Sequence, residues 1–108
     1  MTLEEYKSIG EKYDLVYDDY EECLFLKGKN GDYRFVVSSF KGDKNDGIGG
    51  VYRECVISNI DHSVYPIAYY SSVDPKVFED FIKGFFRNYK KALIVVKTME
   101  LEKDFKND

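Results

Sequence analysis

The segment 41–50 and the residues just after it contain residue types that bind calcium. Three oxygen-bearing residues fall at the first, third and twelfth positions of an EF-hand pattern, namely Asp43, Asn45 and Glu54. Two other positions break the pattern, because the fifth is Gly47 where an acid is usual and the sixth, an invariant glycine, is Ile48. Residues 51–60 also have strand character, whereas an EF-hand continues as a helix. We therefore interpret 41–50 as a glycine-rich hairpin loop and expect neither a metal nor another cofactor.

The single histidine, His62, needs a positioned partner for acid–base or nucleophilic chemistry. The candidate partner is the thiol of Cys55, because cysteine and histidine form a common nucleophilic pair. A strand rises about 3.3 Å per residue, so the intervening chain is expected to hold the two side chains well apart. Both Cys55 and Cys23 lie in apolar runs, which predict buried free thiols. We therefore predict no catalytic residue and no enzyme activity.

Two glycine-rich segments, 27–31 and 47–50, have the composition of phosphate-binding loops. Neither follows a strand and opens a helix with the spacing that such a loop requires. Within the first segment, Asn30–Gly31 supplies the positive φ angles of a tight hairpin turn. Both segments are therefore interpreted as turns.

An acidic segment at residues 13–22 interleaves carboxylates with tyrosines. Its members are Tyr13, Asp14, Tyr17, Asp18, Asp19, Tyr20, Glu21 and Glu22. Carboxylates steer a protein toward a basic partner and tyrosines supply rigid contact area, which makes this segment the candidate protein-binding surface. The alternative is a solvated turn between two strands that only keeps the chain soluble.

A basic face is expected on the second predicted helix. It carries Lys76, Lys83, Arg87, Lys90 and Lys91. The first four recur seven, four and three residues apart and so share one side of a helix. This face is the alternative, anion-binding site, with RNA, a small ligand or an acidic protein as its partner. A solvated face opposite a buried stripe explains the same pattern, and the net charge of −4 disfavours a dedicated nucleic-acid binder.

The elements that position these segments begin with a helix over residues 2–12, because Thr2 and Glu5 have the spacing of a capping box. Strand-like runs then follow at 15–17, 23–26, 33–37, 51–60 and 64–71. Asp74 and Pro75 predict the start of a second helix.

The second helix is expected to run over 75–91 with a broad aromatic stripe. The apolar run 92–96 predicts a last strand, and 98–105 predicts a frayed helix. Residues 1–108 thus form a single α+β domain, in which an antiparallel sheet of five or six strands is packed by the helix 75–91. The amino-terminal helix is expected at an edge or on the same face. The chain lacks a membrane-length apolar run and a secretion signal, so the cytoplasm is the expected location.

This order of elements, in a small acidic chain with ten tyrosines and no recognisable active site, resembles the small phage-encoded inhibitors of bacterial defence, including the anti-CRISPR proteins. The resemblance implies a non-enzymatic inhibitor that occludes a nucleic-acid or partner site on a larger bacterial enzyme. It directs attention to the acidic segment first and to 41–50 next. The alternatives that stay open are an immunity or antitoxin-like protein, a small RNA- or ligand-binding domain and an enzyme with an unrecognised site. A symmetric homodimer also stays open, because tyrosines and strand edges are expected at the surface.

Overall fold

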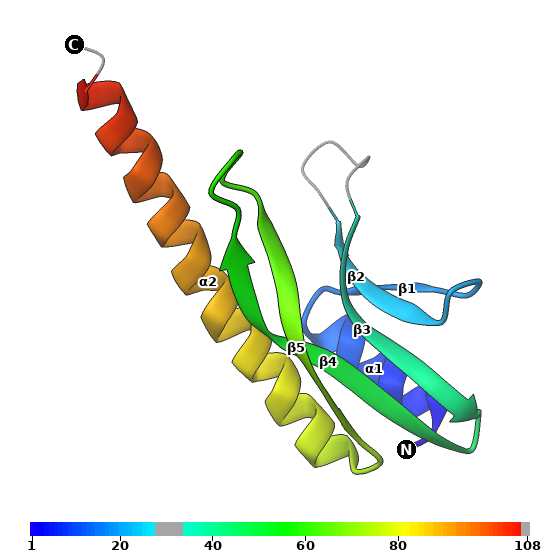
Figure 1. Cartoon of the computed structure of the whole chain (residues 1–108). Coiled ribbons are helices and arrows are strands. Elements are labelled where there is room, and N and C mark those ends of the chain that lie inside the picture. The colour runs from blue at the N-terminus through cyan, green and yellow to red at the C-terminus, as the bar shows by residue number, and fades with distance from the viewer. Residues whose placement is uncertain (28–33, 107–108) are drawn as a thin grey trace.

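A computed structural model describes residues 1–27 and 34–106 of the chain. The helices and strands are, in order, α1 (Leu3–Lys12), β1 (Val16–Asp18), β2 (Cys23–Lys27), β3 (Arg34–Asp43), β4 (Asp46–Ile57), β5 (Val64–Ser72) and α2 (Pro75–Lys106). The predicted Asn30–Gly31 turn lies outside the described residues. The five strands form one antiparallel sheet in the order β1-β2-β3-β4-β5, so each strand pairs with its neighbour in sequence (Figure 1). The expected α+β fold is confirmed, with five strands.

One row of residues across the sheet shows that α1 and α2 cover the same face. The register aligns Tyr17, Leu24, Ser38, Val51 and Tyr70 across the five strands. Tyr6 of α1 packs on this row, with its ring centroid 6.2 Å from that of Tyr17. Phe81 of α2 packs on the other end, 5.8 Å from Tyr70. In Figure 1 both helices accordingly lie behind the sheet.

The hydrophobic core fills the space between this face and the two helices. Its largest fully buried side chains are Tyr6, Leu24, Val37, Val51, Phe78, Ile82 and Phe85. The rings of Tyr6 and Phe78 are 5.3 Å apart and join the two helices directly. Removing this apolar area from water is the main favourable term in folding, and α2 contributes much of it through its aromatic stripe.

Both helices begin at the caps that the sequence predicts. The hydroxyl of Thr2 accepts a hydrogen bond from the amide of Glu5 at 3.1 Å, and the Glu5 carboxylate accepts one from the amide of Thr2 at 2.9 Å. This reciprocal pair completes the capping box. At the start of α2, the Asp74 carboxylate accepts a hydrogen bond from the amide of Lys76 at 2.8 Å.

The predicted loop at 41–50 is wrong, because this segment is a pair of strands. β3 and β4 continue through it and leave a turn of only two residues between them. Glycines at the start of β4 make room for aromatic rings: Phe40 lies against Gly47 and Tyr69 lies against Gly50. Glycine is unusual in a strand interior except where another group approaches the backbone closely, so composition alone pointed to a loop.

The predicted last strand at 92–96 is also wrong, because α2 continues through it to Lys106. A short apolar run fits a strand or a buried helix equally well, and no glycine or proline after Gly84 interrupts the helix. The C-terminal turns of α2, red in Figure 1, extend past the sheet. No helix of the described residues combines the length and the hydropathy needed to cross a bilayer.

Candidate functional site

The acidic segment 13–22 forms β1 and the turn that leads into β2. Within the turn, the Asp18 carboxylate accepts hydrogen bonds from the backbone amides of Tyr20 at 2.8 Å and Glu21 at 3.0 Å. The backbone of Glu22 then has a positive φ of 51°, which reverses the chain into β2. Asp18 therefore holds the turn in shape, and this role is distinct from the steering that the sequence pattern suggested.

The three tyrosines of the segment have different environments. Tyr13 stacks on Phe86, with ring centroids 6.0 Å apart, and Tyr17 packs edge-on against the buried Tyr6. The Lys7 ammonium also lies 4.6 Å from the Tyr17 ring centroid. Tyr20 is 95% exposed at the tip of the turn. Of these three tyrosines, only Tyr20 presents nearly its whole side chain to solvent.

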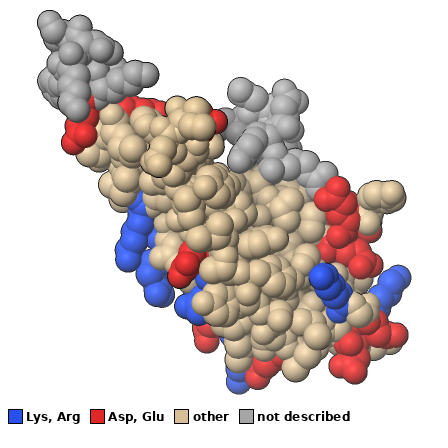
Figure 2. Space-filling view, viewed as in Figure 1, with Lys and Arg blue, Asp and Glu red and all other residues tan. Residues whose placement is uncertain are grey.

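The surroundings of Tyr17 favour the protonated form of its hydroxyl. Desolvation raises the pKa of its hydroxyl, and the nearby carboxylates of Glu22 and Asp19 raise it further. Asp19 and Glu21, the sequence neighbours of Tyr20 in the turn, are both exposed, whereas Asp14 is exposed at the opposite end of β1. Figure 2 shows acidic side chains on the right of the molecule, in the region of the β1–β2 turn. The structure thus brings together one exposed tyrosine and two exposed carboxylates on a hydrogen-bonded turn.

The predicted basic residues are all exposed on α2, namely Lys76, Lys83, Arg87, Lys90 and Lys91. Between residues that the structure describes, the single ion pair joins Lys12 of α1 to Glu79 of α2, with nitrogen and oxygen 3.0 Å apart. None of the five bases takes part in it. The basic side chains therefore keep their charge available along α2, on the left of Figure 2.

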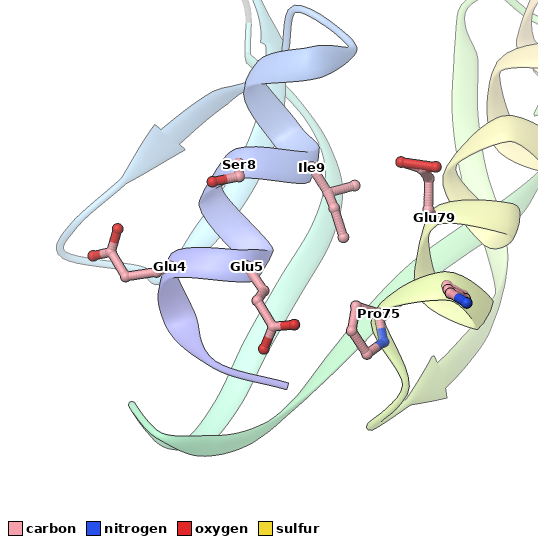
Figure 3. Close-up of a pocket in the computed structure, with 7 residues that line it drawn as sticks. Glu4, Glu5, Ser8, Ile9, Pro75 and Glu79 are labelled. Carbon is pink, nitrogen blue, oxygen red and sulfur yellow. The ribbon is translucent and has the colours of Figure 1, made fainter.

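A cleft of about 410 Å³ lies between the amino-terminal ends of α1 and α2. It is lined by Glu4, Glu5, Ser8, Ile9, Pro75, Lys76 and Glu79 (Figure 3). Two of its carboxylates already have structural partners, because Glu5 caps α1 and Glu79 pairs with Lys12. The capping hydrogen bonds from Thr2 lower the pKa of Glu5. Glu4 points away from α2 in Figure 3, so the cleft does not bring two free carboxyl groups together for acid–base catalysis.

The residues considered for nucleophilic chemistry lie in two separate grooves. Cys55 lies beside Asn88, Lys91 and other residues of α2, whereas His62 lines a groove with Phe35 and Tyr89. Burial raises the pKa of the Cys55 thiol, which favours the unreactive protonated form. The predicted burial holds for Cys23, whereas Cys55 is only half-buried, and neither cysteine forms a disulfide. The structure therefore gives His62 and Cys55 no shared site.

The calcium pattern is likewise divided by the fold. Asp43 ends β3 and Asn45 lies in the two-residue turn that follows, where the Asp43 carboxylate accepts a hydrogen bond from the Asn45 amide at 2.8 Å. Glu54 lies further along β4, opposite Ile67 of β5, and so is separated from that turn along the strand.

Comparison of the chain with known protein families, curated proteins and solved structures found no match.

Proposed function

We propose that this chain is a non-enzymatic binding protein that docks its acidic β1–β2 turn onto a basic site of a larger bacterial enzyme and blocks that site. The observation that carries the proposal is Tyr20, 95% exposed between the acids Asp19 and Glu21. Moving a large aromatic side chain from water into a partner's pocket is favourable, because its apolar surface is removed from water. The exposure of Tyr20 at the tip of an ordered turn therefore supports a contact role.

The turn has the properties of a preorganised contact. Its amides are hydrogen-bonded to Asp18, so binding loses less conformational freedom than it would with an unstructured loop. Carboxylates around Tyr20 raise the association rate with a basic surface and disfavour acidic ones. A nucleic-acid-binding enzyme of the cytoplasm is the partner class that matches this charge. An inhibitor carried by a phage against bacterial defence fits the proposal, and an immunity or antitoxin-like protein would use the same surface.

The test compares two variants that lose the same number of charges. The first changes the turn, D19S/E21S together with Tyr20→Ala, and leaves Asp18 in place. The control changes two exposed acids elsewhere, E54S/D80S. Each tagged protein is incubated with bacterial lysates that contain CRISPR effector complexes, and the captured enzyme is then assayed for nucleic-acid binding.

We expect the wild type and the control to retain one large enzyme and to block its nucleic-acid binding, and the turn variant to do neither. Equal capture by the turn variant would contradict the proposal, as would a captured enzyme whose activity is unchanged. Circular dichroism on all three proteins checks that the fold is intact.

A second candidate function is supported by the exposed bases of α2. Lys83, Arg87 and Lys90 have no ion-pair partner among the described residues, so RNA or another anion would meet little competition there. RNA affinity that falls steeply with salt and is lost in K83S/R87S, but kept in D19S/E21S, would favour this function over the inhibitor.

A further inference from the structure

The C-terminal part of α2 has apolar side chains around its whole circumference. Residues 93–96 read Leu-Ile-Val-Val, four consecutive positions that 100° steps distribute on every side of a helix. Leu93, Ile94 and Val95 are 44%, 66% and 47% exposed, and Leu101, two turns further on, is 53% exposed. A helix that is apolar all round is normally buried in a larger assembly. Leu93 and Val95 border grooves that α2 forms with the sheet, so the uncovered apolar surface of this segment is carried mainly by Ile94 and Leu101.

The shape of the molecule leaves this segment accessible. The chain measures 58 Å along its longest axis and 25 and 21 Å across. In Figure 1 the long axis follows α2, whose orange turns run beside the β4–β5 hairpin and whose red turns extend beyond the sheet. A partner can therefore approach the last turns of α2 from the side opposite the sheet without moving any strand.

The edges of the sheet are poor candidates for the same role. β5 is one edge, and Pro66 within it has no amide to donate to an added strand. Ala68 interrupts β5 further with a left-handed φ of 61°. β1, the other edge, is only three residues long and leads into the acidic turn. Association through α2 is thus favoured over the pairing of strands.

Charges along the exposed side of α2 specify what covers it. Lys91, Val95, Thr98 and Glu102 recur four, three and four residues apart and so share one face. Ile94 and Leu101, two turns apart, lie together along one side of this row. The basic Lys91 and the acidic Glu102 thus lie at opposite ends of this row, with Val95 and Thr98 between them. Two copies aligned antiparallel place Lys91 of each beside Glu102 of the other, whereas a parallel alignment opposes like charges.

We propose that α2 binds a second copy of this chain, in an antiparallel helix pair centred between Val95 and Thr98. Ile94, Val95 and Leu101 form the apolar contact, and two Lys91–Glu102 pairs close its ends. The pair is symmetric, so the same patch serves both copies and the assembly closes as a dimer. It lies apart from the acidic β1–β2 turn, so it leaves that surface free on each copy.

An anionic membrane fits this patch less well than a second helix does. Interfacial helices separate an apolar face from a basic one. Here Lys90, Ile94 and Lys97 alternate on the same side, at spacings of four and three, and Glu102 adds a negative charge. Lysine stems that flank an apolar seam, with their ammonium groups near carboxylates, are typical of paired helices.

The first test measures mass by sedimentation equilibrium from 1 to about 200 µM protein, a range that reaches weak helix pairs. We expect a reversible monomer–dimer equilibrium for the wild type. I94S/L101S should raise the dissociation constant about tenfold or more, because it removes two interfacial apolar side chains. The control Val77→Ser alters an equally apolar exposed residue near the other end of α2 and should leave the constant unchanged. All the changed side chains are solvent-exposed, and thermal unfolding confirms that each variant is folded.

The second test examines the orientation through charge reversal. K91E and E102K should each weaken the dimer, since either creates two repulsive contacts in the antiparallel pair. The double variant K91E/E102K should restore the wild-type dissociation constant. In a parallel pair the double variant would keep like charges opposed and no restoration would occur.

Three results would overturn the proposal. They are a wild type that stays monomeric to about 200 µM, a dimer that I94S/L101S leaves intact, and a monomer that binds phosphatidylserine vesicles through these residues. Loss of dimerisation in I94S/L101S with capture of the enzyme retained would leave the proposed inhibitory function standing, so the two proposals can fail separately.

Discussion

The hydroxyl of Tyr6 on α1 lies 3.0 Å from the hydroxyl of Ser38 on β3, and both residues are fully buried. Ser38 donates its own hydrogen to the carbonyl of Gly50 on β4. Since the single Ser38 hydrogen is used there, the Tyr6 hydroxyl is the donor to Ser38. A chain of two hydrogen bonds therefore links α1 to the two central strands within an otherwise apolar core. Each polar group in it has a partner, as buried polar groups generally require.

The two ends of this chain should respond differently to mutation. Ser38→Ala leaves the buried Tyr6 hydroxyl without an acceptor, and we expect a loss of about 1–3 kcal/mol in the free energy of unfolding. Tyr6→Phe removes a donor but keeps the bond from Ser38 to Gly50, so we expect a smaller loss of about 0.5–1.5 kcal/mol. Urea unfolding of both variants measures the order. A Tyr6→Phe variant that is less stable than Ser38→Ala would contradict this assignment of donor and acceptor.

Burial of Tyr6 also predicts a loss of stability in alkali. Desolvation raises the pKa of its hydroxyl above the ordinary value of 10.0. The folded protein then holds this proton more tightly than the unfolded chain does, so the associated stability is complete below pH 10 and is lost as the pH rises above it. We expect the free energy of unfolding of Tyr6→Phe to fall less steeply above pH 10 than that of the wild type. Parallel slopes for the two proteins would show that Tyr6 contributes nothing to the alkaline transition.

Two helical glycines should respond in opposite directions to alanine. Alanine is favoured over glycine in a helix interior by about 1 kcal/mol. At Gly10 of α1, however, a methyl group would overlap the side chain of the buried Leu24, and such overpacking costs about 1–3 kcal/mol. At Gly84 of α2, an added methyl group would lie 3.3 Å from its nearest neighbour, Nε of Arg53. The long side chain of Arg53 can shift to accommodate it. Thermal unfolding should therefore show Gly10→Ala to be less stable than the wild type and Gly84→Ala to be equal or more stable.

The local signals in this sequence predicted the helix starts better than the extents of the elements. Thr2 and Asp74 marked the two starts correctly, because a cap is formed by residues that are neighbours in sequence. The strand at Gly47 was missed because its glycine is explained by Phe40, a residue of the paired strand. The helical state of 92–96 was missed because apolar composition alone does not separate a strand from a helix.

The same contrast between features set by sequence neighbours and features set by distant residues applies to the candidate surface. The pattern of acids and tyrosines identified the exposed β1–β2 turn, since charge and turn chemistry are local properties. It did not distinguish Tyr20 from Tyr13, which stacks on Phe86 more than sixty residues later in the chain. Contacts of this kind depend on how α2 crosses the sheet, and a single sequence does not record them. The left-handed backbone of Glu22 was also missed, because non-glycine residues seldom adopt it.

Two phenylalanines of the aromatic stripe on α2, Phe81 and Phe85, are buried to different extents. We therefore expect their replacement by alanine to cost different amounts of stability. Phe85 is fully buried, and its ring centroid lies 5.8 Å from that of Phe35 and 5.5 Å from that of Tyr89. Phe85→Ala would leave a cavity among rings that cannot readily collapse, and we expect it to cost about 3–5 kcal/mol. Phe81 is half-buried beneath the Arg53 guanidinium, so water can fill part of the space that its ring leaves. Phe81→Ala should therefore cost clearly less than Phe85→Ala in urea unfolding, and equal losses would mean that α2 packs on the sheet through a different face.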